Sequence, residues 1–587
     1  MSTSADGKII SRLFFSLLPV QILMVAIGSI DSIIDGTIAS NLIGPQAMAV
    51  IGLYMPVLKI SETINAVMLG GSQILCGQFL GKNQIERTRS VFSLDMTVVV
   101  GVSLIMTGIC FIAPVAVAHL LHANADTMDG LVQYILGMAA GLMPQMMGVQ
   151  LTAYLQMEQQ QKRTYIGIAA MMVVNAVLDI VFIKILAWGM LGLGLATTIS
   201  CWVFFLILAS YYFAGKAMIK FDRHGILWSD LVPVLKIGIP GALVTFCLAV
   251  RGITINASLI HYSGSVGVAA LSALNTFGAL LYAVTAGLAA ATRLLISIFY
   301  GEEDRAGMVL VMKTALYKGV PLVCAVSALV FLLAGPMTSI FFKDPSSEVY
   351  YLTKCLFRIF PFSMPLSAIC VIFINYYQSC IRMKIVNILS VTDGVAGVLV
   401  SCLFLAPLYG AMGVWVAHVL NGVYTTAIII AHAWIVRRKM PHSVEDLMTL
   451  SDNFGVPEDS RLDITLHDEA EVIDTSKRVI DFCREKGVTE KRAYYAGLCL
   501  EEMASNIVEH GFTDGKKHTI DVRVVYKEEE LFLRITDNCR AFDPQEKLAL
   551  IDPDDITKNI GLRMVSRISR RMLYSNMLGL NVLTITI

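Results

Sequence analysis

A carboxylate and an amide share one face of a predicted helix near the end of the chain. Glu502 and Asn506 stand four residues apart in LCLEEMASNIVEHG, whose apolar spacing is that of a helix. An amide oxygen can ligate Mg²⁺, and a nearby carboxylate can polarise a nucleophile. Asp537 ends a predicted strand, where it can accept a hydrogen bond from an adenine amino group. Gly561 opens a predicted helix whose N-terminus can receive phosphate. These residues predict an ATP–Mg²⁺ site.

A second set of polar residues stands inside long apolar runs. Asp31 and Asp35 are four residues apart in the first run. Asn175 and Asp179 repeat that spacing in a later run, and Thr197 follows in the next one. A charged side chain at the centre of a membrane helix costs about 2.5–3.5 kcal/mol, so it usually faces a pathway or a partner. We expect this set to bind Na⁺ or a proton. The alternative is that the acids, Asp35 above all, lie near helix ends and reach the lipid headgroups.

Charge divides the chain into two parts that suit different solvents. Residues 1–440 carry 44 charged side chains and a net charge of +8, whereas the last 147 residues carry 46 and a net charge of −8. We expect a membrane domain over 1–440, a linker over 441–459 and a water-soluble domain over 460–587. Neither part has a basic patch of the size that nucleic acid requires, so we expect no nucleic-acid partner.

Residues 1–440 contain twelve apolar stretches of the roughly 20 residues that a membrane helix needs. A repeat at a spacing of about 220 residues relates two sets of six. Pro19 pairs with Pro240, and FLGKN of 79–83 pairs with FYGEE of 299–303. Because six is even, both copies enter the membrane the same way up, which predicts two pseudo-symmetric six-helix bundles around a cavity. The bundles, an N-lobe and a C-lobe, span about 8–215 and about 230–438.

Basic residues indicate the orientation of the helices. Lys and Arg fall on alternate loops, such as EQQQKR and AGKAMIKFDRHG, whereas the opposite loops offer little beyond Lys343. The positive-inside rule then places both termini, and with them the soluble domain, in the cytoplasm. The first apolar run has no small-residue cleavage site after it, so we interpret it as a membrane span and not as a signal peptide.

Residues 1–440 resemble the multidrug and toxic compound extrusion (MATE) family across nearly the whole segment. The matching motifs are IDSIIDG at 30–36, an S-Q…G pattern at 72–81, NAVLD at 175–179 and GLGLAT at 192–197. The resemblance implies a multi-pass, cation-coupled antiporter of a bacterial inner membrane. It also implies a small organic substrate, cationic or amphipathic, in a cavity between two lobes.

The resemblance extends to individual residues of the membrane part. Asp31, Asn175, Asp179 and Thr197 match the family's N-lobe cation site by position. Asp35 departs from the family pattern, since a hydrophobic residue usually stands there, and the choice between Na⁺ and H⁺ therefore stays open. The Met-rich runs MPQMMG and AAMMVVN suit a broad apolar substrate site, although Met is also common membrane filler.

The soluble part alternates between strand and helix patterns. RLDITLH, HTIDVRVVY, ELFLRITD, MLYS and LNVLTITI read as strands, and 470–486, 489–512 and NIGLRMVSRISRR read as helices. Helices on one face of a mostly antiparallel sheet make this an α+β sandwich.

This part resembles the GHKL ATPase superfamily, in the branch of anti-sigma-factor serine kinases. EEMASN, DNCRAFDP and NIGLRMV match its three motif boxes. The resemblance implies that Glu502 is the catalytic base of an ATPase or serine kinase and Asn506 the Mg²⁺ ligand. The residues it places against the nucleotide are Asn506, Asp537, Phe542, Gly561 and Leu562. Two positions depart from the boxes: Cys539 replaces a glycine, and Asn559 replaces another.

The two parts together favour a cation-coupled exporter that its cytoplasmic domain regulates. The chain contains no G-x-x-x-x-G-K-[ST] segment, so a P-loop ATPase does not drive it. An alternative is a membrane sensor whose C-terminal domain phosphorylates or sequesters a regulatory protein partner. A third hypothesis is a flippase for lipid-linked precursors, for which Arg251 and Arg293 are the candidate intramembrane cations.

Overall fold

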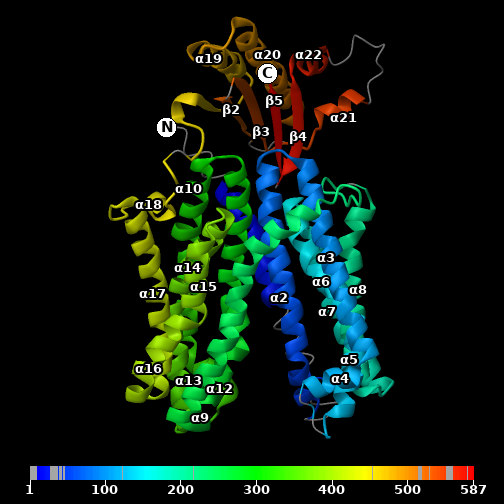
Figure 1. Cartoon of the computed structure of the whole chain (residues 1–587), viewed down its shortest axis with the longest axis vertical. Coiled ribbons are helices and arrows are strands. Elements are labelled where there is room, and N and C mark those ends of the chain that lie inside the picture. Colours follow the sequence, from blue (N-terminus) through cyan, green and yellow to red (C-terminus); the bar gives the residue numbers. More distant parts are fainter. Residues whose placement is uncertain are drawn as a thin grey trace.

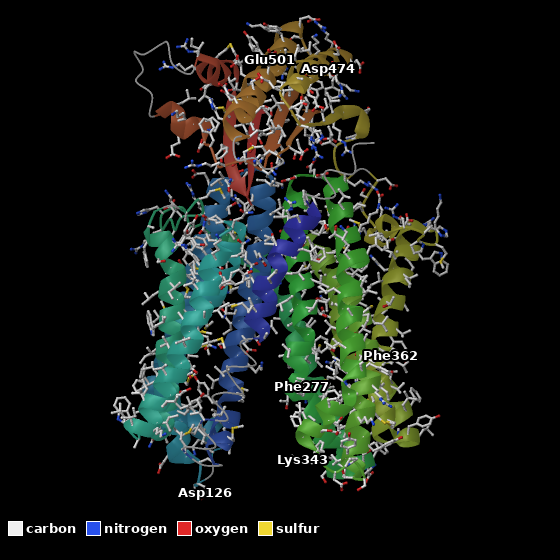
Figure 2. The ribbon with its side chains drawn as sticks, turned by 180° about the vertical axis from the view of Figure 1, so that it is seen from behind. Asp126, Phe277, Lys343, Phe362, Asp474 and Glu501 are labelled. Carbon is white, nitrogen blue, oxygen red and sulfur yellow. The ribbon has the colours of Figure 1, made fainter. Side chains whose placement is uncertain are left out.

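The computed structural model consists of a bundle of long apolar helices with a domain of helices and strands seated on one end (Figure 1). It describes residues 10–512 except 27–37, 39–42, 44–45, 122, 124, 216 and 453, and residues 518–587 except 528, 550–559 and 578. We call the end of the bundle that carries this domain the domain-bearing end. Asp126 of the N-lobe and Lys343 of the C-lobe lie at the opposite end (Figure 2).

The N-lobe is built from apolar helices, because in lipid a helix satisfies every backbone polar group internally. Its elements are a helix over 10–26, α2 (Gln46–Gly81), α3 (Ile85–Ile112), α4 (Pro114–Leu120), α5 (Met128–Ala139), α6 (Leu142–Met157), α7 (Gln161–Asp179), the π-helical turn η1 (Ile180–Ile185) and α8 (Gly189–Phe213). A short turn, η2 (Trp228–Asp230), leads into the second lobe.

The C-lobe repeats this plan, and its first element, α9, contains two spans. Its elements are α9 (Leu231–Gly301), α10 (Arg305–Thr314), η3 (Ala315–Gly319), α11 (Val320–Leu332), α12 (Ala334–Phe341), α13 (Glu348–Ile359), η4 (Phe360–Phe362), α14 (Ser363–Ser379), α15 (Met383–Val391), η5 (Thr392–Ala396), α16 (Gly397–Tyr409) and α17 (Ala411–Arg437). Within α9 the chain turns sharply at Gly264, where φ is 62° and ψ is −157°. This left-handed φ favours glycine, so Gly264 joins two spans within one element.

The twelve predicted spans map onto these elements. Among the described residues, nine helices are long and apolar enough to cross a membrane, and α9 counts as one of them although it contains two spans. The helix over 10–26 and the pair α5 and α6 supply the remaining two. The predicted class, a polytopic helical bundle of two lobes, is confirmed.

The internal repeat is visible in the backbone of matching loops. Asn83 and Glu303, the last residues of the paired FLGKN and FYGEE segments, both have left-handed backbones, with φ of 55° and 54°. In both loops the next N–H bonds to the carbonyl five residues earlier, at 2.7 and 2.9 Å. Gln159 and Ile381 form a second matching pair, with φ of 54° and 58°. The two lobes therefore share local geometry where their side chains differ.

The lobes touch through α2 and α9 at the domain-bearing end. A Cβ on Gly71 would lie 2.0 Å from the Val234 carbonyl oxygen, and a Cβ on Gly238 would lie 1.9 Å from the Val67 carbonyl oxygen. Only glycine allows this approach of the two backbones. Towards the opposite end α2 and α9 diverge (Figure 1).

The C-terminal domain is a five-stranded antiparallel sheet with helices on one face, which confirms the predicted α+β class. Its strands are β1 (Arg461–Leu466), β2 (Ile520–Lys527), β3 (Glu530–Asp537), β4 (Arg571–Met577) and β5 (Leu580–Thr586), in the order β1-β2-β3-β5-β4. Its helices are α19 (Ala470–Glu485), α20 (Glu490–Gly511), α21 (Pro544–Ala549) and α22 (Ile560–Ile568). Asp474 of α19 and Glu501 of α20 lie on the side away from the bundle (Figure 2).

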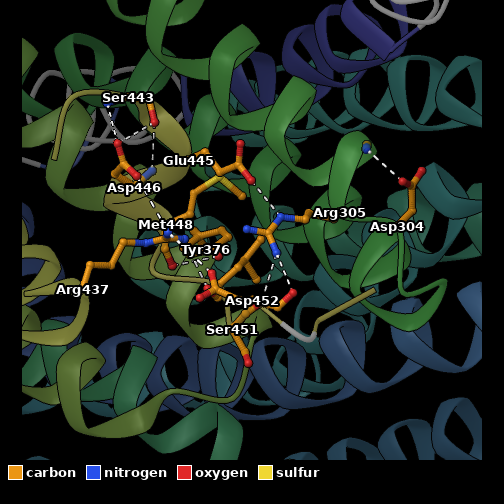
Figure 3. Close-up of polar contacts among 12 residues, drawn as sticks. Asp304, Arg305, Tyr376, Arg437, Ser443, Glu445, Asp446, Met448, Ser451 and Asp452 are labelled. Atoms are coloured by element: carbon orange, nitrogen blue, oxygen red, sulfur yellow. Dashed lines mark hydrogen bonds and ion pairs between the residues drawn. The ribbon is translucent and has the colours of Figure 1, made fainter. Parts of the chain in front are cut away.

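The segment predicted as a linker is folded against the C-lobe. It forms the short helix α18 (Val444–Met448), whose N-cap Ser443 makes a capping box with Asp446. Glu445 accepts from Arg305 at 2.7 Å, and the Met448 carbonyl accepts from the hydroxyl of Tyr376 at 3.0 Å (Figure 3). This segment therefore fixes the C-terminal domain to one lobe.

Candidate functional site

Helix α20 presents the predicted acid and amide together. Glu502 and Asn506 lie half-buried on one face of α20. The Asn506 amide donates to the Glu502 carbonyl at 2.7 Å, which fixes the orientation of the side chain. Because the nitrogen makes this bond, the amide oxygen is the atom that can ligate Mg²⁺.

The start of α22 meets this acid in space. A Cβ on Gly561 would lie 1.8 Å from Oε2 of Glu502, so only glycine lets the carboxylate approach the first turn of α22. Leu562, next in the chain, is buried in the domain core and anchors the helix. The structure thus brings Glu502 next to the N-terminus of α22, where a helix can receive phosphate.

Asp537 ends β3 in a nearly buried position, held by two donors. Its Oδ1 accepts from the Asn581 amide at 2.7 Å and from the Cys539 N–H at 2.9 Å. Burial raises the pKa of Asp537, and the bonds from Asn581 and Cys539 oppose that rise. Asn581 is itself oriented by the Tyr574 hydroxyl at 2.7 Å. Asn581 and Tyr574 are site residues that the sequence did not reveal, since they come from β5 and β4.

Cys539, which departs from the GHKL pattern, has a compensating neighbour. A Cβ on Gly511, the last residue of α20, would lie 2.8 Å from the Cys539 sulfur, so the missing side chain at Gly511 leaves room for the thiol. Phe542 is 46% exposed, and its N–H donates to the Tyr574 hydroxyl at 3.1 Å. The second departure, Asn559, lies outside the described residues.

In the N-lobe, three of the five predicted coupling residues are described. Asn175 and Asp179 are buried in α7, and the Asn175 amide lies 3.5 Å from the Thr197 hydroxyl of α8. Asp179 is the last residue of α7 before the π-helical turn η1, and such turns often mark functional positions. Asp31 and Asp35 lie outside the described residues.

Other buried polar groups of the bundle were not predicted as sites. Asp95 of α3 is fully buried and accepts from the Tyr154 hydroxyl at 2.8 Å. In the C-lobe, Asp393 of η5 accepts from the Asn421 amide at 3.0 Å. A search for acids within apolar runs would have found both, because each stands alone among apolar neighbours in the sequence.

The two arginines on which a flippase would depend are engaged by protein groups. Arg251 donates to the Asp393 carbonyl at 3.1 Å. Arg293 of α9 donates to the Gln73 side chain of α2 at 2.7 Å and so joins the two lobes. Both guanidinium groups therefore contribute to structure within the bundle, which counts against the flippase hypothesis.

Comparison with known proteins identifies both parts of the chain. The MatE family model matches residues 21–181 and 240–403, and the model of the histidine kinase-like ATPase domain matches residues 467–587. The Probable multidrug resistance protein NorM of Chromobacterium violaceum is 23% identical over 60% of this chain and 76% of its own length. The Multidrug export protein MepA of Staphylococcus saprophyticus is 23% identical over 66% of this chain and 86% of its own.

The C-terminal part has a relative of its own. The Serine/threonine-protein kinase BtrW of Bordetella bronchiseptica is 33% identical over 93 residues, which are 15% of this chain and 66% of the kinase. The MATE motifs and the GHKL boxes of the sequence are thus matched by different known proteins.

Solved structures support the fold of the membrane part. A multidrug resistance MATE family transporter in an outward-facing conformation superposes with a TM-score of 0.67 at 18% identity, covering 75% of this chain and 98% of that structure. The bent form of the Vibrio cholerae transporter VcmN gives a TM-score of 0.66 at 17% identity, covering 76% of this chain and all of that structure. The chain therefore belongs to the MatE family, and a histidine kinase-like ATPase domain follows its two transporter lobes.

Proposed function

We propose that this protein is a cation-coupled exporter of small organic molecules, and that its C-terminal domain binds ATP–Mg²⁺ and regulates export. The observation that carries the proposal is a polar group in the N-lobe of a MatE-family chain, formed by the buried Asn175 and Asp179 and the half-buried Thr197. Membership of the family, with NorM and MepA as relatives named for multidrug resistance and export, supports small organic substrates.

An ion gradient supplies the energy in this proposal. A potential of 100 mV is worth about 2.3 kcal/mol for each charge moved, so one Na⁺ or H⁺ per cycle can drive substrate uphill. Asp179 takes the ion with Asn175 and Thr197, and Asp31 and Asp35 are the further ligands expected from the sequence. In this proposal the membrane is a bacterial inner membrane, and the Lys and Arg residues of the loops at the domain-bearing end support a cytoplasmic location for that end.

The C-terminal domain has the groups that ATP needs. Asn506 would hold Mg²⁺, Asp537 would accept from the adenine amino group, and the first turn of α22 would receive phosphate. Glu502 stands at that same turn, where a general base for phosphoryl transfer belongs. One small nucleotide domain beside a two-lobed antiporter supports regulation by ATP, with the ion gradient as the driving force.

Transport by the full chain in lipid vesicles tests the energy source. With ethidium as the organic cation, we expect export that requires an imposed Na⁺ or H⁺ gradient and that Asp179→Asn abolishes. The matched control is Asp126→Asn, because Asp126 is exposed at the far end of the N-lobe (Figure 2). Export that needs ATP hydrolysis and no gradient would contradict the proposal.

Nucleotide binding should depend on pH through Asp537. Burial raises the pKa of Asp537 above its ordinary 3.8, so this carboxylate is protonated at a higher pH than usual. Adenine binding needs the accepting, ionised form. Affinity for a fluorescent ATP analogue is therefore expected to fall as the pH is lowered through this raised pKa. Asp537→Asn should weaken binding about tenfold or more and remove this pH dependence; an unchanged pH profile in the variant would count against the assignment.

The similarity to BtrW favours a second function for the same domain, phosphorylation of a regulatory protein on serine. Glu502 would act as base in that reaction too. Incubation of the full chain with labelled ATP and a cell extract distinguishes phosphorylation of a partner protein from regulation of export. Transfer of label to one protein, lost in Glu502→Gln, would support the kinase. Absence of transfer, together with gradient-driven export whose rate changes when ATP–Mg²⁺ is added, would support regulation of export alone.

A further inference from the structure

The open face of the C-terminal sheet carries basic side chains. Along β2 and β3, residues alternate between the helix-covered core and the opposite face. Val522, Val524 and Leu533 are buried in the core, whereas Arg523 and Arg534 lie on the opposite face. That open face is turned towards the domain-bearing end of the bundle (Figure 1).

Three acids of the C-lobe loop after α9 meet this basic face. Glu302 accepts from Arg534 at 2.6 Å, Glu303 pairs with Lys527 at 3.2 Å, and Asp304 pairs with Arg523 at 3.3 Å. The side chains of Glu302 and Asp304 are each only 10% exposed, so these two pairs are shielded from water. We call these three pairs the C-lobe contact.

The pKa shifts of the two shielded acids agree with this geometry. Burial raises the pKa of Glu302, and Arg534 counteracts that rise. Burial also acts to raise the pKa of Asp304, but Arg523 and the Gly307 N–H outweigh it, so the pKa lies below its ordinary value. Each acid thus depends on an arginine of the C-terminal domain for its charge.

The other half of the sheet rests on the N-lobe. The Asn83 amide donates to the Leu573 carbonyl of β4 at 3.3 Å. A Cβ on Gly579, in the turn between β4 and β5, would lie 2.2 Å from the Gln159 side chain, so this turn sits directly on the loop between α6 and α7. We call this the N-lobe contact.

The C-terminal domain therefore spans both lobes through loops that the internal repeat relates. Asn83 of the N-lobe contact and Glu303 of the C-lobe contact occupy equivalent positions. Only the C-lobe copy of this loop carries a run of acids. The basic residues of β2 and β3 therefore find ion-pair partners only when these two strands lie over the C-lobe. The folded segment 443–452 ties the domain to the C-lobe a second time.

We infer that the C-terminal domain is a clamp that holds the domain-bearing ends of the two lobes together and that opens at the N-lobe contact. The inference rests on the proposed function, because alternating access requires the lobes to separate at this end. The C-lobe contact has three ion pairs. In addition, segment 443–452, which connects the domain covalently to the C-lobe, is hydrogen-bonded to that lobe. The N-lobe contact has a neutral hydrogen bond and the approach of Gly579 to Gln159, without an ion pair among the described residues, and it is the weaker of the two. Export is therefore restrained while the clamp is closed.

A cross-link across the N-lobe contact tests the clamp. Asn83→Cys and Leu573→Cys place thiols on the two sides of the 3.3 Å bond between these residues. We expect a short bis-methanethiosulfonate reagent to join them through two disulfides, with methanesulfinate as the leaving group. Vesicles that hold the cross-linked protein should export ethidium at least about fivefold more slowly, and reduction of the two disulfides should restore export. Treated Asn83→Cys alone is the control, since the native cysteines are present in it too. Equal export before and after reduction would overturn the clamp.

Charge exchange at the C-lobe contact gives a second test. Arg534→Glu and Glu302→Arg should each lower the cross-link yield at the N-lobe contact and raise export at least about fivefold, and the double variant should return both to the starting level. Arg484→Glu, which breaks an exposed ion pair with Glu490 elsewhere in the domain, should change neither. Failure of the double variant to restore the yield would overturn the clamp. If no variant exports under any gradient, the proposed function fails, while the yields still report whether the domain is docked.

Discussion

The two lobes of this transporter have the same backbone in matching loops and different chemistry on it. The loops around Asn83 and Glu303 share a left-handed residue and a hydrogen-bond pattern. Residues 82–84 of the first carry one base, Lys82, whereas residues 302–304 of the second are three acids. The same divergence occurs within the membrane, where the N-lobe buries Asn175 and Asp179 and the C-lobe joins Arg251 to the backbone of Asp393. The lobes therefore share a local geometry, and the proposed function divides ion coupling and structural support between them.

The sharpest test of this division compares one acid from each lobe. Asp179→Asn should lower gradient-driven export at least about a hundredfold, which corresponds to about 2.7 kcal/mol, because Asp179 is the acid that we propose binds the coupling ion. Asp393→Asn should leave coupling intact and lower thermal stability, because the Asp393 side chain accepts from Asn421 within the C-lobe. Initial rates in vesicles and unfolding temperatures in detergent measure both. Equal loss of export in the two variants would contradict the division.

The two docking contacts should differ in strength. Glu302→Gln weakens a shielded ion pair and is expected to cost about 1–3 kcal/mol of docking. Asn83→Ala removes one neutral hydrogen bond and should cost about 1 kcal/mol or less. Hydrogen exchange of the β2 and β3 amides in the full chain reports docking in each variant. A larger effect of Asn83→Ala would place the anchor on the N-lobe and reverse the direction in which the clamp opens.

The smallest effect is expected from a substitution that gives the C-lobe loop the asparagine found at the equivalent position of the N-lobe loop. Glu303→Asn loses a half-exposed ion pair with Lys527, which is worth about 0–1 kcal/mol. Asparagine tolerates the left-handed backbone at this position better than glutamate does, which offsets the loss. We expect docking and stability to change by less than about 0.5 kcal/mol. A large loss would mean that this pair contributes more than its exposure indicates.

Local spacing made much of this molecule predictable. The i, i+4 pair Glu502 and Asn506, the twelve spans and the repeat of FLGKN in FYGEE all depend on periodicity, which a sequence displays directly. Other features involve segments that are far apart in the sequence. Gly511 leaves space for the side chain of Cys539, and Asn581 donates a hydrogen bond to Asp537. Residue spacing in the sequence does not predict either contact.

The docking of the C-terminal domain on the helical bundle could not be predicted from the sequence, for a different reason. The acids of FYGEE and the basic residues of β2 and β3 look like ordinary solvated charges in the sequence, and only their juxtaposition pairs them. The charge pattern predicts a linker over 441–459 because this segment lies between the membrane part and the soluble part. Its capped helix and its bonds to Arg305 and Tyr376 depend on the surface of the C-lobe, which the segment does not encode by itself.

The most direct test of the account is the effect of ATP–Mg²⁺ on gradient-driven ethidium export by the full chain in vesicles. The account predicts that export proceeds without nucleotide, that ATP–Mg²⁺ on the domain-bearing side changes its initial rate at least about fivefold, and that Asn506→Ala removes this change while keeping basal export. A rate that ATP–Mg²⁺ leaves unaltered, or export that requires ATP and no gradient, would contradict it.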